Sequence, residues 1–390
     1  MWTGDNLPIM RGMNSESVDL IYLDPPFNSK ANYAAPIGSK AAGAAFKDTW
    51  TLSDVDAEWV NLMEAKHPAL HRVLLAAMTP SDKSYLAYMA VRLLEMRRLL
   101  KPTGSIYLHC DPTMGAYLKL LLDSVFGRKA FRNEIVWSYQ RWTGATRHFQ
   151  RMHDTVWFYA MERAGFNMLK EAYSAKSKHK GARRTVFVGG QIEQSYTGDT
   201  SRQKAMRDVW EISYLNSQAK ERTGYPTQKP LALLRRIVEA SSNPGDMLLD
   251  PFAGCATACI AAEQLDRQWV GIDISEKAAE LVKRRMDAEL GLFYKGAHRT
   301  DIPKRTDLGK LAPYNSASNK RNLYGQQEGQ CAGCDTHFEA RNLEVDHIIA
   351  RVKGGTDHLE NLQLLCGSCN RIKGDRGMEY LQVKLQLKGF

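Results

Sequence analysis

The sequence lacks any long apolar run. No stretch approaches the roughly 18 consecutive apolar residues that a membrane span requires, so we expect no membrane interaction. The first residues, MWTGDNLPIM, also lack the basic and then apolar regions of a secretion signal. Internal repeats are missing, and the only low-complexity tract is a small alanine cluster at 41–45. We therefore expect a cytoplasmic globular protein.

Cysteine is scarce as well. Three of the seven cysteines, Cys110, Cys255 and Cys259, stand alone in apolar surroundings. A free thiol there behaves as a small buried hydrophobic residue, so we expect no function of them. The other four form two Cys-x-x-Cys pairs within the last 60 residues.

What is present is an ordinary globular composition, with 44% hydrophobic and 25% charged residues. The 390-residue length exceeds that of a usual single domain, so we expect two or three domains, each with its own hydrophobic core. The formal net charge is +10, and residues 128–230 hold all of the excess, with 19 Lys/Arg against 9 Asp/Glu. The same segment also carries the aromatic residues Trp137, Tyr139, Trp142, Phe149, Trp157, Phe158 and Tyr159. This mixture suits a phosphate backbone and exposed bases, although charge alone fits a solvated basic face equally well.

The hydrophobic pattern predicts an α/β fold. Short apolar runs, typical of strands buried on both faces, occur at 17–23, 105–111, 247–250 and 269–273. Helical spacing is found at 84–100, 113–127, 231–242 and 274–290, with turns predicted at 101–104 and 243–246. The alternation indicates a doubly wound parallel sheet. The polar stretch 296–322 has no periodicity and is expected to be a linker.

Two short motifs follow predicted strands. Asp250-Pro-Phe-Ala-Gly254 stands where a strand gives way to a helix, and Asp273 ends the next strand, as in sites that bind a nucleoside cofactor. A structural glycine turn is the alternative. Asp24-Pro-Pro-Phe27 places a carboxylate, a proline carbonyl and an aromatic ring on a stiff turn. Such a turn can accept both hydrogens of an exocyclic amine while the ring stacks on its base, and an ordinary proline turn that caps a strand is the alternative.

Together these motifs resemble those of the permuted, beta-class amino-methyltransferases of DNA. The resemblance covers residues 1 to about 290 and runs through these segments in order: Gly4-Asp5, Ser17-Val-Asp-Leu-Ile-Tyr-Leu-Asp-Pro-Pro-Phe27, Lys101-Pro-Thr-Gly-Ser-Ile-Tyr-Leu-His-Cys-Asp111, Asn133-Glu-Ile-Val-Trp137, Pro226-Thr-Gln-Lys-Pro230, Asp250-Pro-Phe-Ala-Gly254 and Gly271-Ile-Asp273. It implies a Rossmann-like, S-adenosylmethionine-dependent methyltransferase at 1–295. The catalytic half would be 1–127, the basic target-recognition insertion 128–225 and the cofactor half 226–295.

The resemblance also implies roles for single residues. The amine-gripping catalytic loop would be Asp24, Pro25, Pro26 and Phe27. The cofactor-binding residues would be Asp5, Thr227, Lys229, Asp250, Phe252, Gly254, Thr257 and Asp273. One departure is Ala256, where the family commonly has glycine, and we expect it to narrow the cofactor loop.

The implied substrate is a base extruded from double-stranded DNA. The motif DPPF favours adenine N6 by resemblance, while the N4 amine of cytosine has the same hydrogen-bond needs. Since related methyltransferases are often dimers, a homodimer is a further expectation.

The C-terminal region carries a second set of motifs. Cys331, Cys334, Cys366 and Cys369 can close a tetrahedral zinc site with no open position, which would be structural. A redox function of either pair, or a zinc ribbon that only binds a partner, is the alternative.

Between and after these pairs lie Asp346-His347, Asn361 and Asn370-Arg-Ile-Lys373. They resemble the HNH, or ββα-metal, nucleases, with the match covering about 323–378 and the domain expected at 323–390. The resemblance implies His347 as general base, Asp346 and Asn370 as ligands of Mg²⁺ or a similar divalent ion, and Asn361 as the residue that orients the loop of His347. A domain that binds DNA without cutting it is the alternative.

Overall fold

The structure is a computed structural model. It describes residues 1–28, 31–34, 45–48, 67–141, 144, 146–172, 183–188, 191–196, 203–216, 218–290, 296–309, 311–353 and 355–387. Trp142 and most of the alanine cluster at 41–45 lie outside the described residues.

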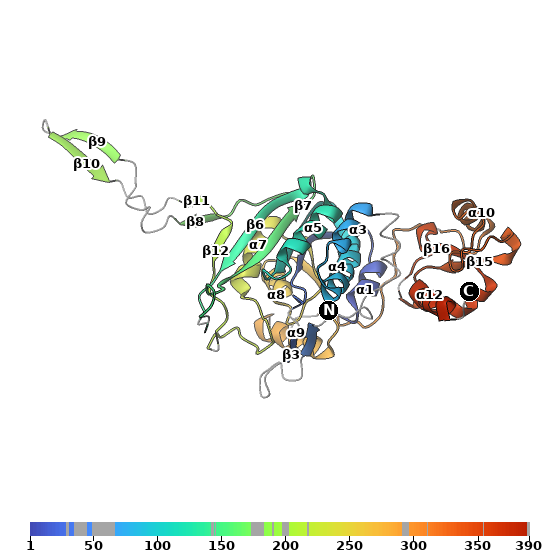
Figure 1. Ribbon diagram of the computed structural model, residues 1–390. Helices are drawn as coiled ribbons and strands as arrows, with labels where there is room; N and C mark the ends of the chain where they lie inside the picture. The colour runs from blue at the N-terminus through green and yellow to red at the C-terminus, as the bar shows by residue number, and fades with distance from the viewer. Residues whose placement is uncertain are drawn as a thin grey trace.

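An eight-stranded sheet forms the centre of the N-terminal unit (Figure 1). Its strand order is β1-β14-β13-β2-β5-β7-β6-β12. The bounds are β1 Trp2–Thr3, β2 Val18–Leu23, β5 Leu100–Cys110, β6 Phe131–Ser138, β7 His153–Ala160, β12 Val209–Glu211, β13 Met247–Asp250 and β14 Gln268–Asp273. The predicted α/β class is therefore confirmed.

The sheet is mixed, whereas the sequence pattern predicted a parallel one. β7 runs antiparallel to both of its neighbours, β5 and β6, and the other neighbouring pairs are parallel. The described residues between β6 and β7 contain no helix, and such a connection suits antiparallel strands.

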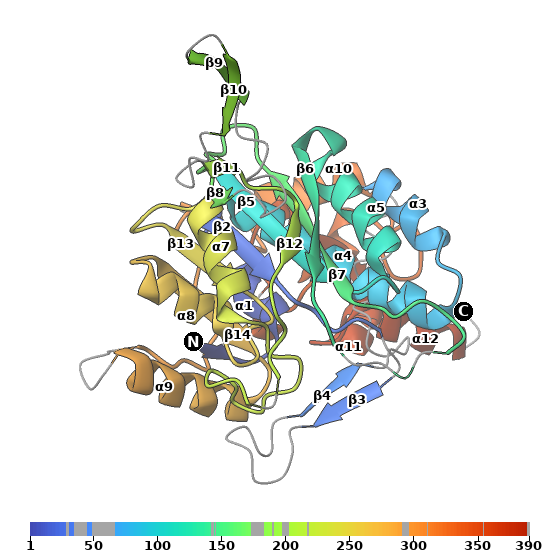
Figure 2. The same cartoon turned by 90° about the vertical axis from the view of Figure 1, so that its left-hand side faces the viewer.

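Helices cover both faces of the sheet, as Figure 2 shows for α4 and α5 on one side and α7 and α8 on the other. Successive residues of a strand point to opposite faces. Ile21 and Leu23 of β2 accordingly pack in the core beneath α4 and α5, while Leu20 and Tyr22 pack in the core beneath α7 and α8. The helices are α1 Asn6–Gly12, α3 Pro68–Leu75, α4 Pro80–Leu99, α5 Gly115–Phe126, α7 Leu231–Ser241, α8 Thr257–Gln264 and α9 Glu276–Leu290.

Two predicted boundaries differ from the structure. Helix α4 begins at Pro80 rather than at residue 84, because Thr79 caps it by accepting a hydrogen bond from the Asp82 amide at 3.1 Å. The predicted turn at 101–104 is wrong, since β5 already begins at Leu100. Its pairing with β2 is irregular there, as Val18 pairs with Leu100 and Leu20 with Ser105.

Short two-stranded ribbons lie outside the central sheet. They pair β3 (Ala31–Ala34) with β4 (Ala45–Asp48), β8 (Lys170–Ala172) with β11 (Gln203–Ala205), and β9 (Arg183–Val188) with β10 (Gln191–Tyr196). Figure 1 shows the β9–β10 ribbon standing away from the sheet.

Part of the predicted linker 296–322 is bound to the N-terminal unit. The amide of Thr3 donates to the carbonyl of Arg299 at 2.9 Å, beside strand β1. Further along, the amides of Ser15 and Thr306 donate to the side chains of Asp307 and Asn14, respectively. Residues 297–307, which we call the docked segment, therefore extend the edge of the sheet and are not a free linker.

The C-terminal unit has its own small core (Figure 1, red). The antiparallel pair β15 (Leu343–His347) and β16 (Leu362–Cys366) is followed by helix α11 (Gly367–Lys373), which gives a ββα arrangement. Helices α10 (Ala317–Gln326) and α12 (Met378–Leu387) flank it, with short 3₁₀ turns at Ala340–Asn342, Arg351–Lys353 and Leu359–Asn361. Helix α10 begins inside the range predicted as linker.

Among the described residues, no helix combines the length and the apolar character needed to cross a bilayer.

Candidate functional site

The carboxyl ends of the parallel strands bring the two N-terminal motifs together. Asp24 follows β2, while Asp250 and Asp273 end β13 and β14, three strands that are neighbours in the sheet. A cavity of about 540 Å³ opens at this edge. All twelve residues predicted for the methyltransferase site line it: Asp5, Asp24, Pro25, Pro26, Phe27, Thr227, Lys229, Asp250, Phe252, Gly254, Thr257 and Asp273.

At one end of the cavity, Asp24 is held by a single ion pair. Its Oδ2 accepts from Lys229 Nζ at 2.5 Å, and both side chains are largely buried. Its Oδ1 is buried and has no hydrogen-bond partner among the described residues. The ring of Phe27 lies below the same ammonium, 5.3 Å from Nζ, and stacks on His109 with centroids 6.2 Å apart. This end therefore presents an unused acceptor beside an aromatic face.

His109 connects the corner at 24–27 to the rest of the sheet. It is fully buried, and its ring nitrogens lie 3.1 Å from Tyr22 Oη and 3.2 Å from Asp154 Oδ2. Burial alone would raise the pKa of Asp154, but the hydrogen bonds from His109 and Tyr139 and the charges of His109 and Lys229 together lower that pKa. Sequence reasoning missed His109, because a histidine inside an apolar strand carries no visible signal.

At the other end of the cavity, the backbone turns sharply at Gly254. Its φ is +51°, and a Cβ there would lie 2.9 Å from the ring of Tyr225. Its amide donates to Asp273 Oδ2 at 2.8 Å, and the amide of Ser275 donates to Oδ1 at 2.8 Å. Burial raises the pKa of Asp273, and it raises the pKa of Asp250 further still. This narrow, acidic bend has the shape and the acceptors to hold a ligand that carries amine and hydroxyl groups.

Ala256 has a different effect from the one expected. It adopts a left-handed backbone conformation with φ of +53°, which is energetically unfavourable for a residue other than glycine. Its methyl group is buried in the core beneath α7 and α8. It does not line the cavity. The substitution therefore strains the loop without narrowing the cavity.

The turn at 223–230 closes the cavity from the side of α7. Thr227 has φ of +61°, which is rare for a β-branched residue and is typical of functional loops held by their surroundings. Gln228 supplies that support, because it accepts from the amide and hydroxyl of Thr223 at 2.8 Å and donates to the carbonyl of Glu221 at 2.8 Å. Lys229 is thereby directed toward Asp24.

Arg92 is a second lining residue that sequence reasoning missed. It is buried on α4, where its Nη2 donates to Asp5 at 2.8 Å and its Nε donates to Asn6 at 2.6 Å. Asn6 in turn donates to the carbonyl of Pro251 at 2.7 Å. Arg92 therefore ties the first turn of α1 to the turn that contains Pro251.

The basic segment 128–230 is not uniformly exposed. Of the seven aromatic residues named from the sequence, four are buried in the cores on the two faces of the sheet: Trp137, Trp157, Phe158 and Tyr159. Tyr139 is half-buried, and Phe149 is fully exposed. The interpretation that all these aromatic residues face nucleic acid is thus wrong for the buried four. They lie on strands β6 and β7, and their side chains pack into the hydrophobic cores.

In the C-terminal unit, the side chain of His347 contacts both Asp357 and Tyr314. Its Nε2 lies 2.8 Å from Asp357 Oδ1, and its ring packs against Tyr314 with centroids 4.7 Å apart. Arg351 pairs with both oxygens of Asp357. Burial would raise the pKa of Asp357, but its bonds to Arg351 and His347 lower it. The Nε2 atom of His347 is therefore engaged by Asp357.

Asn361 holds the loop that follows His347. Its Oδ1 accepts from the amide of Ile349 at 2.9 Å, and its Nδ2 donates to the carbonyls of Ile349 at 3.0 Å and Thr356 at 2.8 Å.

The residues expected to bind a divalent ion are already engaged. Asp346 Oδ2 lies 3.0 Å from the ammonium of Lys373, a fully buried residue, and also accepts from Gln363 at 3.0 Å. Asn370 donates to Glu344 at 2.6 Å. Hard oxygen donors are present, although Oδ2 of Asp346 is already paired with the ammonium of Lys373.

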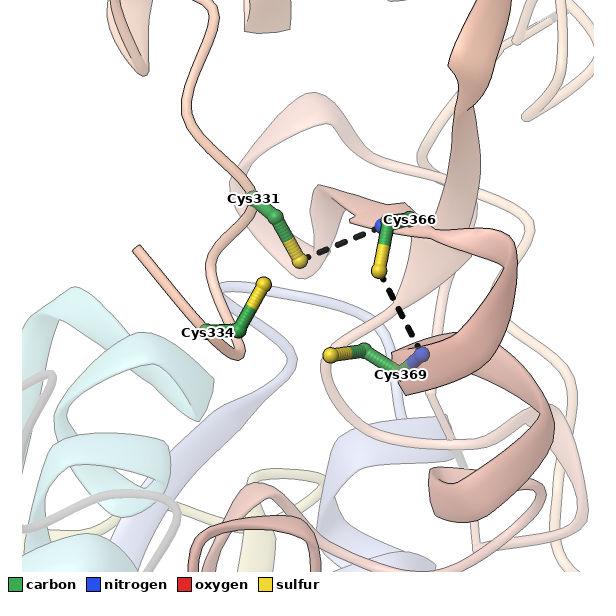
Figure 3. Close-up of side chains that lie close together, drawn as sticks. All are labelled: Cys331, Cys334, Cys366 and Cys369. Atoms are coloured by element: carbon green, nitrogen blue, oxygen red, sulfur yellow. Dashed lines mark hydrogen bonds between the residues drawn. The ribbon is translucent and has the colours of Figure 1, made fainter. Parts of the chain in front are cut away.

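The four cysteines of the C-terminal unit converge (Figure 3). The Sγ atoms of Cys331, Cys334, Cys366 and Cys369 all lie within 4.8 Å of one another. Cys331 Sγ accepts from the amide of Cys366, and Cys366 Sγ from that of Cys369. Tetrahedral thiolates around zinc, at Zn–S of about 2.3 Å, stand about 3.8 Å apart, so the cluster fits that ion.

Comparison with known proteins accords with this geometry. A family model described as DNA methylase matches residues 18–284, more than half of the chain, and one described as HNH endonuclease matches residues 331–376. The chain belongs to the DNA methylase family. This DNA methylase is thus a DNA methyltransferase that also carries an HNH endonuclease domain.

Two curated relatives cover much of this DNA methylase. DNA adenine methyltransferase YhdJ of Escherichia coli (strain K12) is 28% identical over 317 residues, which are 80% of this chain and 92% of the relative. Type II methyltransferase M.HpaI of Haemophilus parainfluenzae is 27% identical over 284 residues, 73% of each chain. Among solved structures, the M1.HpyAVI–SAM complex is 18% identical with a TM-score of 0.43, covering 74% of this chain and 100% of that one.

Proposed function

We propose that this DNA methylase transfers the methyl group of S-adenosylmethionine to adenine N6 of a base extruded from double-stranded DNA. We also propose that its HNH domain cleaves DNA. The observation that carries the first proposal is a single cavity, lined at one end by the corner at 24–27 and at the other by the bend at Gly254. A methyl donor and its acceptor must meet in one such space.

The chain's own residues would prepare the acceptor. Asp24 Oδ1, buried and unpartnered, would accept one amine hydrogen, and the carbonyl of Pro25 would accept the other. Accepting these hydrogens localises the nitrogen lone pair, which is otherwise delocalised into the base. Phe27 would stack on the base, with Pro26 stiffening the turn.

S-adenosylmethionine supplies an electrophilic methyl group. Its methionine end would be held by Asp250, Phe252, Gly254 and Thr257. Its ribose would be held by Asp273, and Asp5 would lie near its adenine. Thr227 and Lys229 would belong to the cofactor-binding turn at 223–230. The fit is supported by the carboxylates of the bend and by the space that Gly254 leaves beside Tyr225.

Adenine is the proposed base because YhdJ, the relative that matches over 92% of its own length, is named an adenine methyltransferase. Digestion of methylated DNA to nucleosides, followed by mass spectrometry, separates N6-methyladenine from N4-methylcytosine. The latter product would overturn this part of the proposal.

Paired variants test the two proposed activities together. Asp24→Ala should abolish transfer of tritiated methyl groups to unmethylated phage lambda DNA and leave plasmid nicking intact. His347→Ala should abolish nicking and leave methyl transfer intact. Loss of both activities in either folded variant would contradict this division.

For the HNH domain we propose His347 as general base, oriented by Asn361, with Asp346 and Asn370 as ligands of a Mg²⁺-type ion. Such an ion stabilises charge on the scissile phosphate. The engagement of Asp346 by Lys373 favours a second candidate, a domain that binds DNA without cutting it. Nicking of plasmid that requires added Mg²⁺ and His347 would exclude this second candidate.

Zinc in the four-cysteine cluster would be structural, since a tetrahedral thiolate site leaves no open position. We further propose domains at 1–295 and 323–390 joined by 296–322, with the docked segment packed on the first. A homodimer stays a prediction, which light scattering of the purified protein tests.

A further inference from the structure

Phe149 is the most exposed aromatic side chain among the described residues of the basic segment. Phe149 is 98% exposed, whereas Trp137, Trp157, Phe158 and Tyr159 are buried within the sheet's two cores. An aromatic ring in water contributes little to packing of the core. Single exposed apolar residues are common, and the position of this one decides its meaning.

The strand register places Phe149 at the catalytic edge of the sheet. Leu23, just before Asp24, pairs with Leu108 of β5, and Cys110 of β5 pairs with Thr155 of β7. The start of β7 therefore lies at the edge where β2 ends. The connection from β6 to β7, closed by a hydrogen bond from the Tyr139 amide to the Met152 carbonyl at 2.9 Å, emerges at that edge and carries Phe149.

The surroundings of Phe149 are positively charged. Arg141, Arg147 and Arg151 are all exposed along the same connection. The nearest carboxylate in sequence, Asp154, is turned inward and bonded to His109 and Tyr139. Arginines beside an exposed ring suit phosphates that flank a base step.

A continuous row of rings joins this surface to the catalytic corner. Phe27 contacts His109, which contacts Trp137 at 5.6 Å between centroids, and Trp137 contacts Tyr139 at 4.8 Å. The ring centroids of Tyr139 and the half-exposed Tyr214 lie 6.2 Å apart. The connection that carries Phe149 is thus anchored, through Tyr139, to the ring expected to stack on the target base.

We propose that Phe149 is a wedge that enters the duplex and occupies the space left by the extruded target base, with Arg147 and Arg151 bound to the adjacent phosphates. This inference rests on the proposed methyl transfer to an extruded base. Extruding a base from duplex DNA costs stacking and pairing energy, and an inserted ring replaces part of the lost stacking.

The test compares a paired target with one that is already open. Wild-type protein and unmethylated phage lambda DNA first identify the methylated site by long-read sequencing. Two short duplexes of that site are then made, one with the target base paired and one with it opposite an abasic position. Single-turnover methylation is measured with the full-length chain in Mg²⁺-free buffer.

Phe149→Ala should be at least about tenfold slower than wild type on the paired duplex, given the worth of stacking one base on an aromatic ring. It should be close to wild type on the opened duplex, and Phe149→Trp should restore the paired rate. Phe166→Ala is the matched control, because Phe166 is 51% exposed in the same segment but follows β7 at the opposite edge, where Ala160 pairs with Ser105. This control should match wild type on both duplexes.

The outcomes separate this inference from the proposed function. Wild type that methylates neither lambda DNA nor either duplex would overturn the proposed function itself. Active wild type with Phe149→Ala unimpaired on the paired duplex, or equally impaired on both duplexes, would overturn the wedge. The wedge is equally overturned if Phe166→Ala shows the same selective loss.

Discussion

Lys229 Nζ lies 2.5 Å from Asp24 Oδ2 and joins two motifs that are 205 residues apart in the sequence. The resemblance to methyltransferases implied a cofactor role for Lys229. The geometry also places its ammonium on the carboxylate expected to hold the substrate amine. By occupying Oδ2, Lys229 fixes the orientation in which Oδ1 stays free.

Lys229→Met should reduce the rate of methyl transfer about 100-fold, because a displaced Asp24 no longer meets the amine in a productive geometry. The dissociation constant for S-adenosylmethionine, measured by calorimetry, should change little. Lys229→Arg, which keeps the charge, should recover part of the rate. Weakened cofactor binding with an unchanged rate at saturation would show that Lys229 serves the cofactor instead.

Gly254→Ala should weaken the binding of S-adenosylmethionine by about tenfold or more, because the new Cβ would lie 2.9 Å from Tyr225 in a left-handed conformation. Gly245→Ala is the matched control, since Gly245 has φ of +87° but no atom within 4 Å of the new Cβ. That control should lose about 1 kcal/mol of unfolding free energy and keep its cofactor affinity. Equal losses of affinity in both variants would mean that backbone strain, and not the space beside Tyr225, is responsible.

Removing one cysteine of the cluster should release the metal. Cys334→Ser is expected to lower the zinc content from about one ion per chain to near zero, measured by plasma mass spectrometry, and to unfold the C-terminal unit. Methyl transfer should persist, because the catalytic cavity lies in the other unit. Cys110→Ser should keep its zinc, and a zinc content unchanged in Cys334→Ser would refute the site.

The docked segment should stabilise the methyltransferase unit. A chain ending at 309 should unfold with a free energy about 3 kcal/mol greater than that of a chain ending at 295, because several hydrogen bonds worth about 1 kcal/mol each tie 297–307 to the N-terminal residues. Urea denaturation of the two chains measures the difference. Identical urea midpoints for the two chains would show that 297–307 does not stabilise the methyltransferase unit, and that this unit ends at 295.

The sequence motifs at strand ends identified the residues of the cavity because parallel strands end at a common edge. Asp24, Asp250 and Asp273 needed only that topology to be brought together. Arg92 could not be found in the same way, since an arginine within a helical pattern resembles a surface residue until Asp5 and Asn6 are seen beside it.

Two further errors have a similar cause. The sequence could not show that β7 runs antiparallel to its neighbours, because burial on both faces produces the same apolar run in either direction. The aromatic residues of the basic segment were treated as one class, although Trp157 and Phe158 lie in a strand and Phe149 in a connection. Composition over a hundred residues cannot make that distinction.

The docked segment also sets the reach of the nuclease. The chain is bound to the methyltransferase unit as far as Asp307, and Tyr314 already packs on His347. A fully extended chain advances at most about 3.6 Å per residue, so this tether spans no more than about 25 Å, the rise of roughly seven base pairs. The proposed nuclease residue His347 therefore stays within about 25 Å of Asp307 on the methyltransferase unit, apart from the short distance across the contact between Tyr314 and His347.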